Sequence, residues 1–367
     1  MKLFHLRHLI FIYLLVMTFF KRSTGQNIIA YYAGNSGQFS EYPVSRLSHI
    51  IFSFCHLKGN KLSVDNRSDS ITIHALVGLK KKNPSLKILL SLGGWGGCKN
   101  CSVVFSTETG RADFVESVLA LTDYFQTDGI DLDWEFPSVA AFPDHPYRPE
   151  DKVHFNMLIR ALRIRLGNAK EISVICAGFD PYLENSLDLP ALAPYVNRIN
   201  LMTYDLIGSQ AKFSGHQSAL YATSWQSASA DRAVRYLDSL KIPNEKIAIG
   251  VAFYARQYQV LEDRDHGLNQ PAQFKKFVTM RQVRKIYTDD QGYTTYWDPE
   301  AAAAYKFNNR NKIFLTYDDE HSVAAKCAYV KEKGLNGIFF WQLRLDKPHD
   351  GLLDVMADAM RIHYDHK

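Results

Sequence analysis

Eight apolar runs that alternate with helix-like segments constrain the fold of this chain more than any other feature. Each run is short and mostly apolar, which is typical of strands buried on both faces. The runs lie at about 28–33, 47–55, 86–92, 128–135, 172–178, 197–204, 246–254 and 336–342. Segments with helical periodicity lie at about 69–82, 107–125, 151–167, 230–241, 320–333 and 351–362. This order predicts an α/β fold, a (β/α)8 TIM barrel, with a doubly wound open sheet as the alternative.

One stretch exceeds what eight strands and their helices need. Residues 257–313 follow the seventh predicted strand and contain aromatic residues, charged residues and Gly292. We predict that they form a small α+β insertion. No linker rich in Pro, Thr or Ser divides the chain, so residues 26–367 are expected to form one barrel domain that carries this insertion.

The N-terminal segment has the pattern of an export signal. Basic residues begin it, twelve uncharged residues follow from Leu9 to Phe20, and small residues at 23–25 offer a cleavage site. Such a run is too short to span a bilayer. We predict a signal peptide at residues 1–25 and a secreted protein, or a periplasmic one if the host is bacterial. An uncleaved anchor is the alternative, because Lys21 and Arg22 follow the run directly.

Charge and motif content argue against several kinds of partner and cofactor. The signal segment holds four basic and no acidic residues, so the formal charge falls from +5 to about +1 without it. The sequence has no basic stripe suited to nucleic acid. It has neither ligand pairs spaced for zinc nor the glycine spacing of a phosphate-binding loop. We therefore expect no nucleic-acid partner, no metal or other cofactor, no stable membrane insertion after signal cleavage, and a monomer.

The five cysteines fit an exported protein. Cys98 and Cys101 are close enough in sequence to pair in a loop, and an oxidising compartment permits disulfides. Their spacing leaves both a disulfide and two free thiols open. Cys176 and Cys327 lie in apolar or helical runs, so we expect them to be buried thiols.

The fourth apolar run contains a ladder of acids, in the stretch Asp-Gly-Ile-Asp-Leu-Asp-Trp-Glu-Phe-Pro that begins at Asp128. On a strand, Asp131, Asp133 and Glu135 would line one side, at about 6.5–7 Å between neighbours. Repulsion and desolvation favour protonation of such a stack, and a neutral acid near pH 7 can donate a proton. Glu135 lies at the carboxyl end, where α/β folds place active sites. Asp128 is out of phase and is expected only to cap the turn. A solvated edge strand is the alternative.

Polar and aromatic residues also gather at the carboxyl ends of five other predicted strands. Ser91 is placed to donate a hydrogen bond to a buried acid such as Asp131. Aromatic faces stack on sugar rings, while Asp, Tyr and Arg bind hydroxyl groups, so the set suits a neutral polysaccharide. Core packing is the alternative for each aromatic residue taken alone. The set comprises Tyr31, Ser91, Gly94, Trp95, Met202, Tyr204, Asp205, Tyr254, Arg256 and Trp341.

These motifs resemble those of the family 18 glycoside hydrolases, the chitinase family. The segment Asp128–Glu135 matches its Asp-x-x-Asp-x-Asp-x-Glu signature, and Ser91–Trp95 is similar to its Ser-x-Gly-Gly motif. Met202–Asp205, Tyr254–Arg256 and Trp341 resemble the motifs of its sixth, seventh and eighth strands. The resemblance covers about 28–353, and the insertion is similar to the family's small α+β domain, which deepens one wall of the substrate cleft.

The resemblance implies a retaining mechanism in which the 2-acetamido group of the substrate attacks the anomeric carbon. Glu135 would be the general acid and then the base, Asp133 would hold the acetamido N–H, and Asp131 would keep Asp133 protonated or oriented in the resting state. Tyr204 would position the acetamido oxygen, and Trp341 would lie beneath the strained sugar. The other substrate-binding residues implied are Tyr31, Ser91, Gly94, Trp95 (on the leaving-group side), Met202, Asp205, Tyr254 and Arg256.

The function that we expect is therefore that of a secreted chitinase, with chitin or chitooligosaccharides as substrate and residues 26–367 as the catalytic domain. An endo-β-N-acetylglucosaminidase acting on N-glycans and a chitin-binding lectin on the same barrel are the alternatives. A lectin would normally have lost the terminal acid, whereas Glu135 is present. Two departures from the family pattern, Gln342 with Leu343 after the tryptophan and a short insertion, bear on which chain end is attacked.

Overall fold

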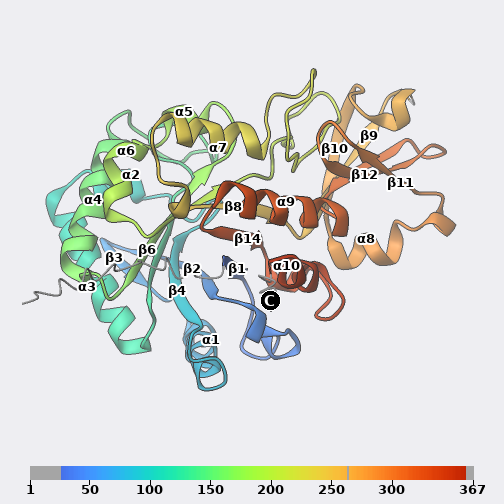
Figure 1. Cartoon of the computed structure of the whole chain (residues 1–367). Helices are drawn as coiled ribbons and strands as arrows, with labels where there is room; N and C mark the ends of the chain where they lie inside the picture. Colours follow the sequence, from blue (N-terminus) through green and yellow to red (C-terminus); the bar gives the residue numbers. More distant parts are fainter. Residues whose placement is uncertain (1–25, 263, 361–367) are drawn as a thin grey trace, which may run out of the picture.

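The computed structural model describes residues 26–262 and 264–360, and eight parallel strands form a closed barrel at its centre (Figure 1). Each strand pairs with the next, and pairing of the last strand with the first closes the ring. This confirms the predicted TIM barrel and excludes the open sheet. The strands are β1 (Asn27–Tyr32), β2 (His49–Lys58), β4 (Lys87–Gly93), β5 (Gly129–Asp133), β6 (Glu171–Ala177), β7 (Arg198–Met202), β8 (Ile247–Ala252) and β14 (Gly337–Trp341).

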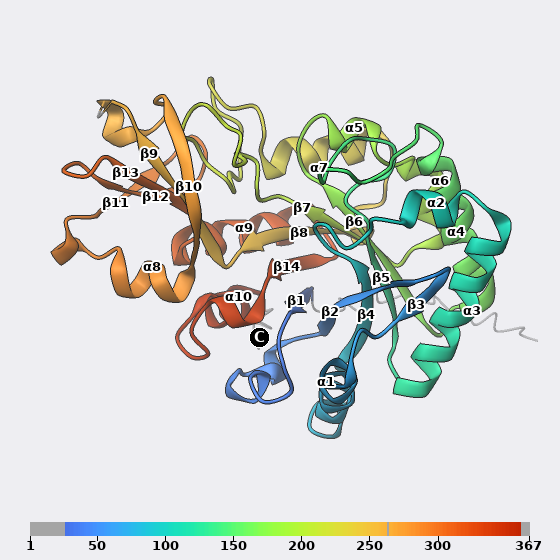
Figure 2. The same cartoon turned by 180° about the vertical axis from the view of Figure 1, so that it is seen from behind.

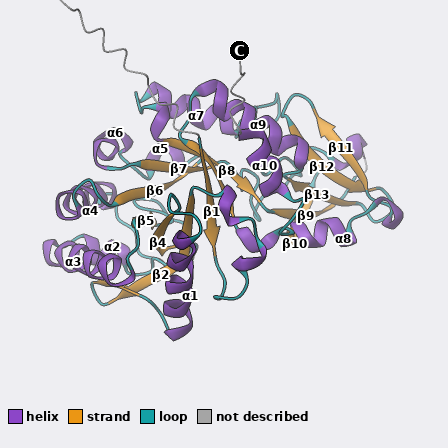
Figure 3. Cartoon of the chain, turned by 60° about the horizontal axis from the view of Figure 1, so that its bottom comes forward, coloured by secondary structure: helices purple, strands orange, loops and turns teal. Residues whose placement is uncertain are grey.

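Helices surround the strands (Figure 3). Their apolar faces cover the barrel, as in α4, where Phe155, Leu158 and Leu162 are buried. α3 begins after Thr107, whose side chain accepts a hydrogen bond from the Gly110 N–H. The helices are α1 (Arg67–Gly78), α2 (Cys101–Phe105), α3 (Glu108–Phe125), α4 (Asp151–Leu166), α5 (Tyr182–Asn185), α6 (Leu189–Leu192), α7 (Ala230–Ser239), α9 (Glu320–Lys333) and α10 (Leu352–Met360).

An antiparallel sheet of five strands lies between β8 and α9 in the chain and to one side of the barrel (Figure 2). It has its own apolar cluster, in which Tyr258, Phe307 and Phe314 are buried. The sheet contains most of the segment 257–313, and the division of the chain into domains stays a prediction. Its elements are β9 (Tyr254–Val260), β10 (Ala272–Thr279), α8 (Met280–Ile286), β11 (Thr294–Asp298), β12 (Ala303–Asn308) and β13 (Ile313–Tyr317), and β3 (Lys61–Ser63) pairs separately with β2.

Further expectations concern the cysteines, Asp128 and the N-terminal segment. Cys98 and Cys101 form a disulfide, and Cys176 and Cys327 are buried thiols as predicted. Asp128 lies at the start of β5, where it accepts the Ile88 N–H and pairs with a lysine, which agrees with a capping role. The expected signal peptide, residues 1–25, lies outside the described residues. None of the described helices combines the length and apolar character that crossing a membrane requires.

Candidate active site

The acid ladder lies inside the barrel at the carboxyl end of β5. Asp131 pairs in register with Ser91 of β4 and Ser173 of β6, and both Asp131 and Asp133 are buried. The expectation that all three acids share one strand is wrong, because β5 ends at Asp133 and Glu135 lies two residues beyond it. The side chains of Asp133 and Glu135 nonetheless lie close enough to perturb each other's pKa, so the ladder continues past the strand.

Asp131 is held by four donors on four different strands. Ser91 Oγ donates at 2.9 Å, which is the hydrogen bond expected from the sequence, and Ser173 Oγ donates to the other carboxylate oxygen. Tyr31 O–H donates at 3.1 Å and Asn200 Nδ2 at 3.2 Å. Burial raises the pKa of Asp131, while the hydrogen bonds from the two serines oppose that rise. The donors therefore favour an ionised carboxylate at the base of the ladder.

Asp133 and Glu135 both have pKa values above those of ordinary carboxyl groups. Burial raises the pKa of Glu135 to about 8, and the negative charge of Asp205 contributes. Burial, followed by the charges of Glu135 and Asp131, raises the pKa of Asp133 well above its usual value. Oδ1 of Asp133 is buried without a hydrogen-bond partner in the described part of the chain. Two carboxyl groups in contact inside a protein do not both ionise readily, so the pair is suited to hold and deliver a proton.

A second cluster lies beside the ladder, after the end of β7 and at the start of β9. Asp205 accepts two hydrogen bonds on one oxygen, from the Tyr254 O–H and from Arg256 Nε, each at 2.7 Å. The Tyr204 ring lies 6.2 Å from that of Tyr254. Burial, together with the charges of Asp133 and other acids, raises the pKa of Tyr204 well above its usual value. Tyr204 is therefore a phenol that can donate a hydrogen bond. Met202 packs into the same inner cluster.

Aromatic rings form the floor and rim of the site. Trp341 stacks on Phe54, with ring centroids 5.6 Å apart and planes at 14°, and lies 5.9 Å from Tyr31. Gly94 permits this packing, because a Cβ atom there would lie 2.3 Å from the Phe54 ring. Trp95 is 59 % exposed and is placed to meet a ligand from solvent.

Tyr31, Met202, Tyr204 and Tyr254 pack in one inner cluster with Trp341, while Trp95 is exposed. Three further residues contact the predicted ones and were not predicted from the sequence. Ser173 and Asn200 contact Asp131, and Phe54 supports Trp341. Their signal in the sequence was weak. Each lies within an apolar run. For Ser173 and Asn200, the only sequence signal is a position on the strand that alternates with the outward-facing residues and so faces the barrel interior.

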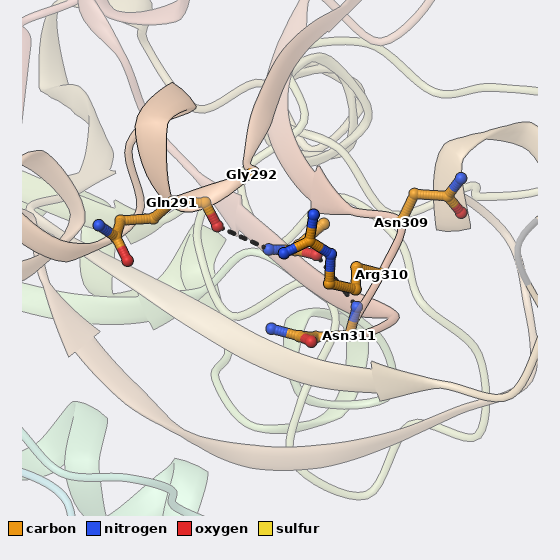
Figure 4. A pocket seen from close by; sticks show the side chains of 6 residues that line it. Gln291, Gly292, Asn309, Arg310 and Asn311 are labelled. Atoms are coloured by element: carbon orange, nitrogen blue, oxygen red, sulfur yellow. Dashed lines mark hydrogen bonds between the residues drawn. The ribbon is translucent and has the colours of Figure 1, made fainter.

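A separate pocket of about 440 Å³ lies at the turn between β12 and β13, away from the ladder (Figure 4). Asn308 Nδ2 donates to the Gln291 carbonyl across it at 3.0 Å. The side chains that line it are amides and one guanidinium, which form a turn and offer no acid for chemistry. Its residues are Gln291, Gly292, Asn308, Asn309, Arg310 and Asn311. Within residues 26–262 and 264–360, His, Cys, Asp and Glu side chains form no group of three that could hold a metal ion.

Comparison with known proteins agrees with this geometry. The family model described as Glycosyl hydrolases family 18 matches residues 27–346. The chain belongs to this family. It is 32% identical to chitinase A1 of Niallia circulans over 75% of the chain and 43% of that protein. It is 31% identical to mouse chitotriosidase-1 over 82% of the chain and 67% of that protein. Among solved structures, the family 18 N-acetylglucosaminidase of Paenibacillus barengoltzii superposes with a TM-score of 0.82 at 30% identity, covering 91% of this chain and 99% of the other.

Proposed function

We propose that this family 18 protein is a secreted glycoside hydrolase that cleaves β-1,4-linked N-acetylglucosamine polymers or oligomers. The observation that carries the proposal is the pair Asp133 and Glu135 at the carboxyl end of β5 inside the barrel, where burial raises the pKa of both acids. Two relatives named chitinase A1 and chitotriosidase-1 support chitin as the substrate class. The N-terminal export pattern supports secretion.

The spacing of the acids favours a substrate-assisted, retaining mechanism. A retaining glycosidase with an enzymatic nucleophile keeps its two carboxyl groups about 5–5.5 Å apart, on opposite sides of the scissile bond. Asp133 instead adjoins Glu135 on the same ladder, so it is not placed as a nucleophile on the opposite side of the bond. The acetamido oxygen of the substrate is then the group that attacks the anomeric carbon.

Each acid has a distinct task in this mechanism. Glu135 donates its proton to the glycosidic oxygen and later removes a proton from the attacking water. Asp133 turns from Glu135 to accept the acetamido N–H and to stabilise the positive charge of the oxazolinium ion. Asp131 stays ionised and favours that charge from below. Tyr204 donates to the acetamido oxygen, and the protonated phenol required for this agrees with its raised pKa.

The other predicted residues bind the sugar chain. Trp341, supported by Phe54, offers a flat apolar face beneath the reacting sugar, and Trp95 offers a second face at the exposed rim. Asp205, oriented by Tyr254 and Arg256, is placed to bind sugar hydroxyl groups, and Tyr31, Ser91, Gly94 and Met202 shape the floor.

Product analysis tests the function directly. The purified protein is incubated with chitin oligomers and, separately, with a high-mannose glycopeptide, and the products are identified by mass spectrometry. Cleavage of the oligomers alone supports the proposal. Release of glycan from the glycopeptide supports the endo-β-N-acetylglucosaminidase instead, and binding of oligomers without any cleavage supports a lectin.

A further inference from the structure

A layer of charged side chains lies inside the barrel one level below the acids. Its members occupy inward-facing positions at the amino ends of four strands: His49 of β2, Lys87 of β4, Glu171 of β6 and Arg198 of β7. A charged layer here requires an explanation, because a barrel interior is usually filled with apolar side chains.

Arg198 is the central residue of the layer. Its side chain is 2% exposed, and its Nε donates to Asn200 Oδ1 at 2.9 Å. Its Nη1 lies 3.6 Å from Glu171 Oε2 and 3.3 Å from His49 Nε2. Nη2 is buried without a partner among the described residues. Burial of an incompletely paired guanidinium costs free energy. A nearby negative charge other than Glu171 would offset part of this cost.

The hydrogen bond to Asn200 connects this layer with the ladder. Because the Asn200 carbonyl oxygen accepts from Arg198, the amide NH₂ must face the other way. There it donates to Asp131 Oδ1 at 3.2 Å and to the Tyr31 oxygen at 2.9 Å. The guanidinium thus fixes the orientation of the amide that holds Asp131.

Among the basic side chains of this layer, Arg198 is the main buried cation near Asp131. Burial, with the charge of Arg198, lowers the pKa of His49 to about 4, so His49 is neutral at pH 7. Lys87 is half-exposed and pairs with Glu171. The positive charge of Arg198 also opposes the effect of burial on the pKa of Asp131.

We propose that Arg198 is a positioning residue that keeps Asp131 ionised and Asn200 oriented, so that the proton of the ladder stays on Asp133 and Glu135. This inference rests on the proposed function for its catalytic consequence, but not for its effect on Asp131. The titratable groups that face Asp131 and Arg198 in the barrel are Tyr31, Asp133, Tyr204, His49, Lys87 and Glu171.

The test measures protonation of Asp131 directly, by an infrared titration of buried carboxyl groups assigned by their loss in Asp131→Asn. Arg198→Met should move the midpoint of the Asp131 titration to higher pH by about one pH unit. This estimate is the Coulomb effect of losing one charge at a distance of two strand spacings. Glu171→Gln should move it to lower pH, because a nearby negative charge is removed. Arg198→Lys should leave the midpoint near that of the wild type, because the charge is retained.

A readout of activity complements the titration. In the proposed mechanism Asp131 acts in its ionised form, so the acidic limb of the kcat/KM profile should shift upward in Arg198→Met and downward in Glu171→Gln. Lys326→Met is the matched control, because Lys326 is a cation buried between Asp318 and Ser218. It should lower stability without moving the Asp131 midpoint.

Several outcomes would overturn the inference. An unchanged Asp131 midpoint in Arg198→Met, or the same direction of shift in Arg198→Met and Glu171→Gln, would show a merely structural residue. If Arg198→Met does not fold, the inference is tested by the other two variants. It then requires a downward shift of the Asp131 midpoint in Glu171→Gln and an unchanged midpoint in Arg198→Lys. If the wild type cleaves no oligomer, the proposed function fails, while the infrared midpoints still decide the role of Arg198.

Discussion

Glu135 combines a raised pKa with a side chain that as a whole is only partly buried. Replacement by glutamine keeps the shape and removes the proton. Glu135→Gln should lower kcat on chitin oligomers by a factor on the order of 10²–10⁴ and leave the dissociation constant nearly unchanged. Steady-state kinetics and calorimetry measure the two quantities. Glu41→Gln, at an exposed position, is the control, and retained turnover in Glu135→Gln would remove Glu135 from its assigned role.

Asp205 sets the pH range of the same acid. A general acid must be protonated, so activity should decline as pH rises through the Glu135 pKa of about 8. The negative charge of Asp205 helps to raise that pKa, after burial. Asp205→Asn should therefore move the basic limb of the kcat/KM profile to lower pH. The loss of Asp205 also leaves Arg256 unpaired, which acts in the same direction. A basic limb that stays in place or moves upward contradicts this assignment.

At the scale of elements, the sequence predicted the barrel strands well because each is an apolar run with a helix after it. It did not predict where β5 stops. Trp134 and Glu135 continue the alternation of the strand, but the paired backbone ends where Gly93 meets Asp133. Strand ends depend on the neighbouring strand, which a local pattern does not contain.

The charged layer escaped prediction for a related reason. His49, Glu171 and Arg198 lie at the edges of separate apolar runs, where a charged residue normally marks the boundary with solvent. Only closure of the barrel brings them together, over separations of up to 149 residues in sequence. The acid ladder, in contrast, is contiguous, so its pattern was visible without the fold.

The loop after β4 gives a prediction about local packing. Gly94 has φ of +80°, and a Cβ atom there would lie 2.3 Å from the Phe54 ring. Gly94→Ala should lower the free energy of unfolding by about 1–3 kcal/mol and raise KM, because Phe54 and the stacked Trp341 must move. Chemical denaturation and kinetics measure the two effects. Gly78→Ala is the control, because Gly78 has helical angles and open space at its Cβ position. Equal effects of the two substitutions would argue against the packing role of Gly94.

At the scale of the whole molecule, a buried ion pair joins the barrel to the antiparallel sheet. Asp318 follows β13, which is the last strand of that sheet in chain order, and pairs with Lys326 of α9. The carboxylate also accepts the Ala252 N–H at the end of β8, at 3.2 Å. Ser218 donates to Asp318 and receives a hydrogen bond from Lys326. The sheet, the barrel and the loop after β7 therefore meet at two charges that are almost completely buried.

Removing one of these charges should cost more than removing both. Lys326→Met leaves the Asp318 carboxylate buried without its cation, and we expect the free energy of unfolding to fall by about 3–5 kcal/mol. Adding Asp318→Asn removes the uncompensated charge, so the double variant should be more stable than Lys326→Met alone. Urea denaturation of the wild type, both single variants and the double variant gives the coupling between the two sites. Additive losses would mean that the two charges act independently. A positive coupling would identify this pair as the contact through which the sheet is held against the end of β8, next to Tyr254 and Arg256.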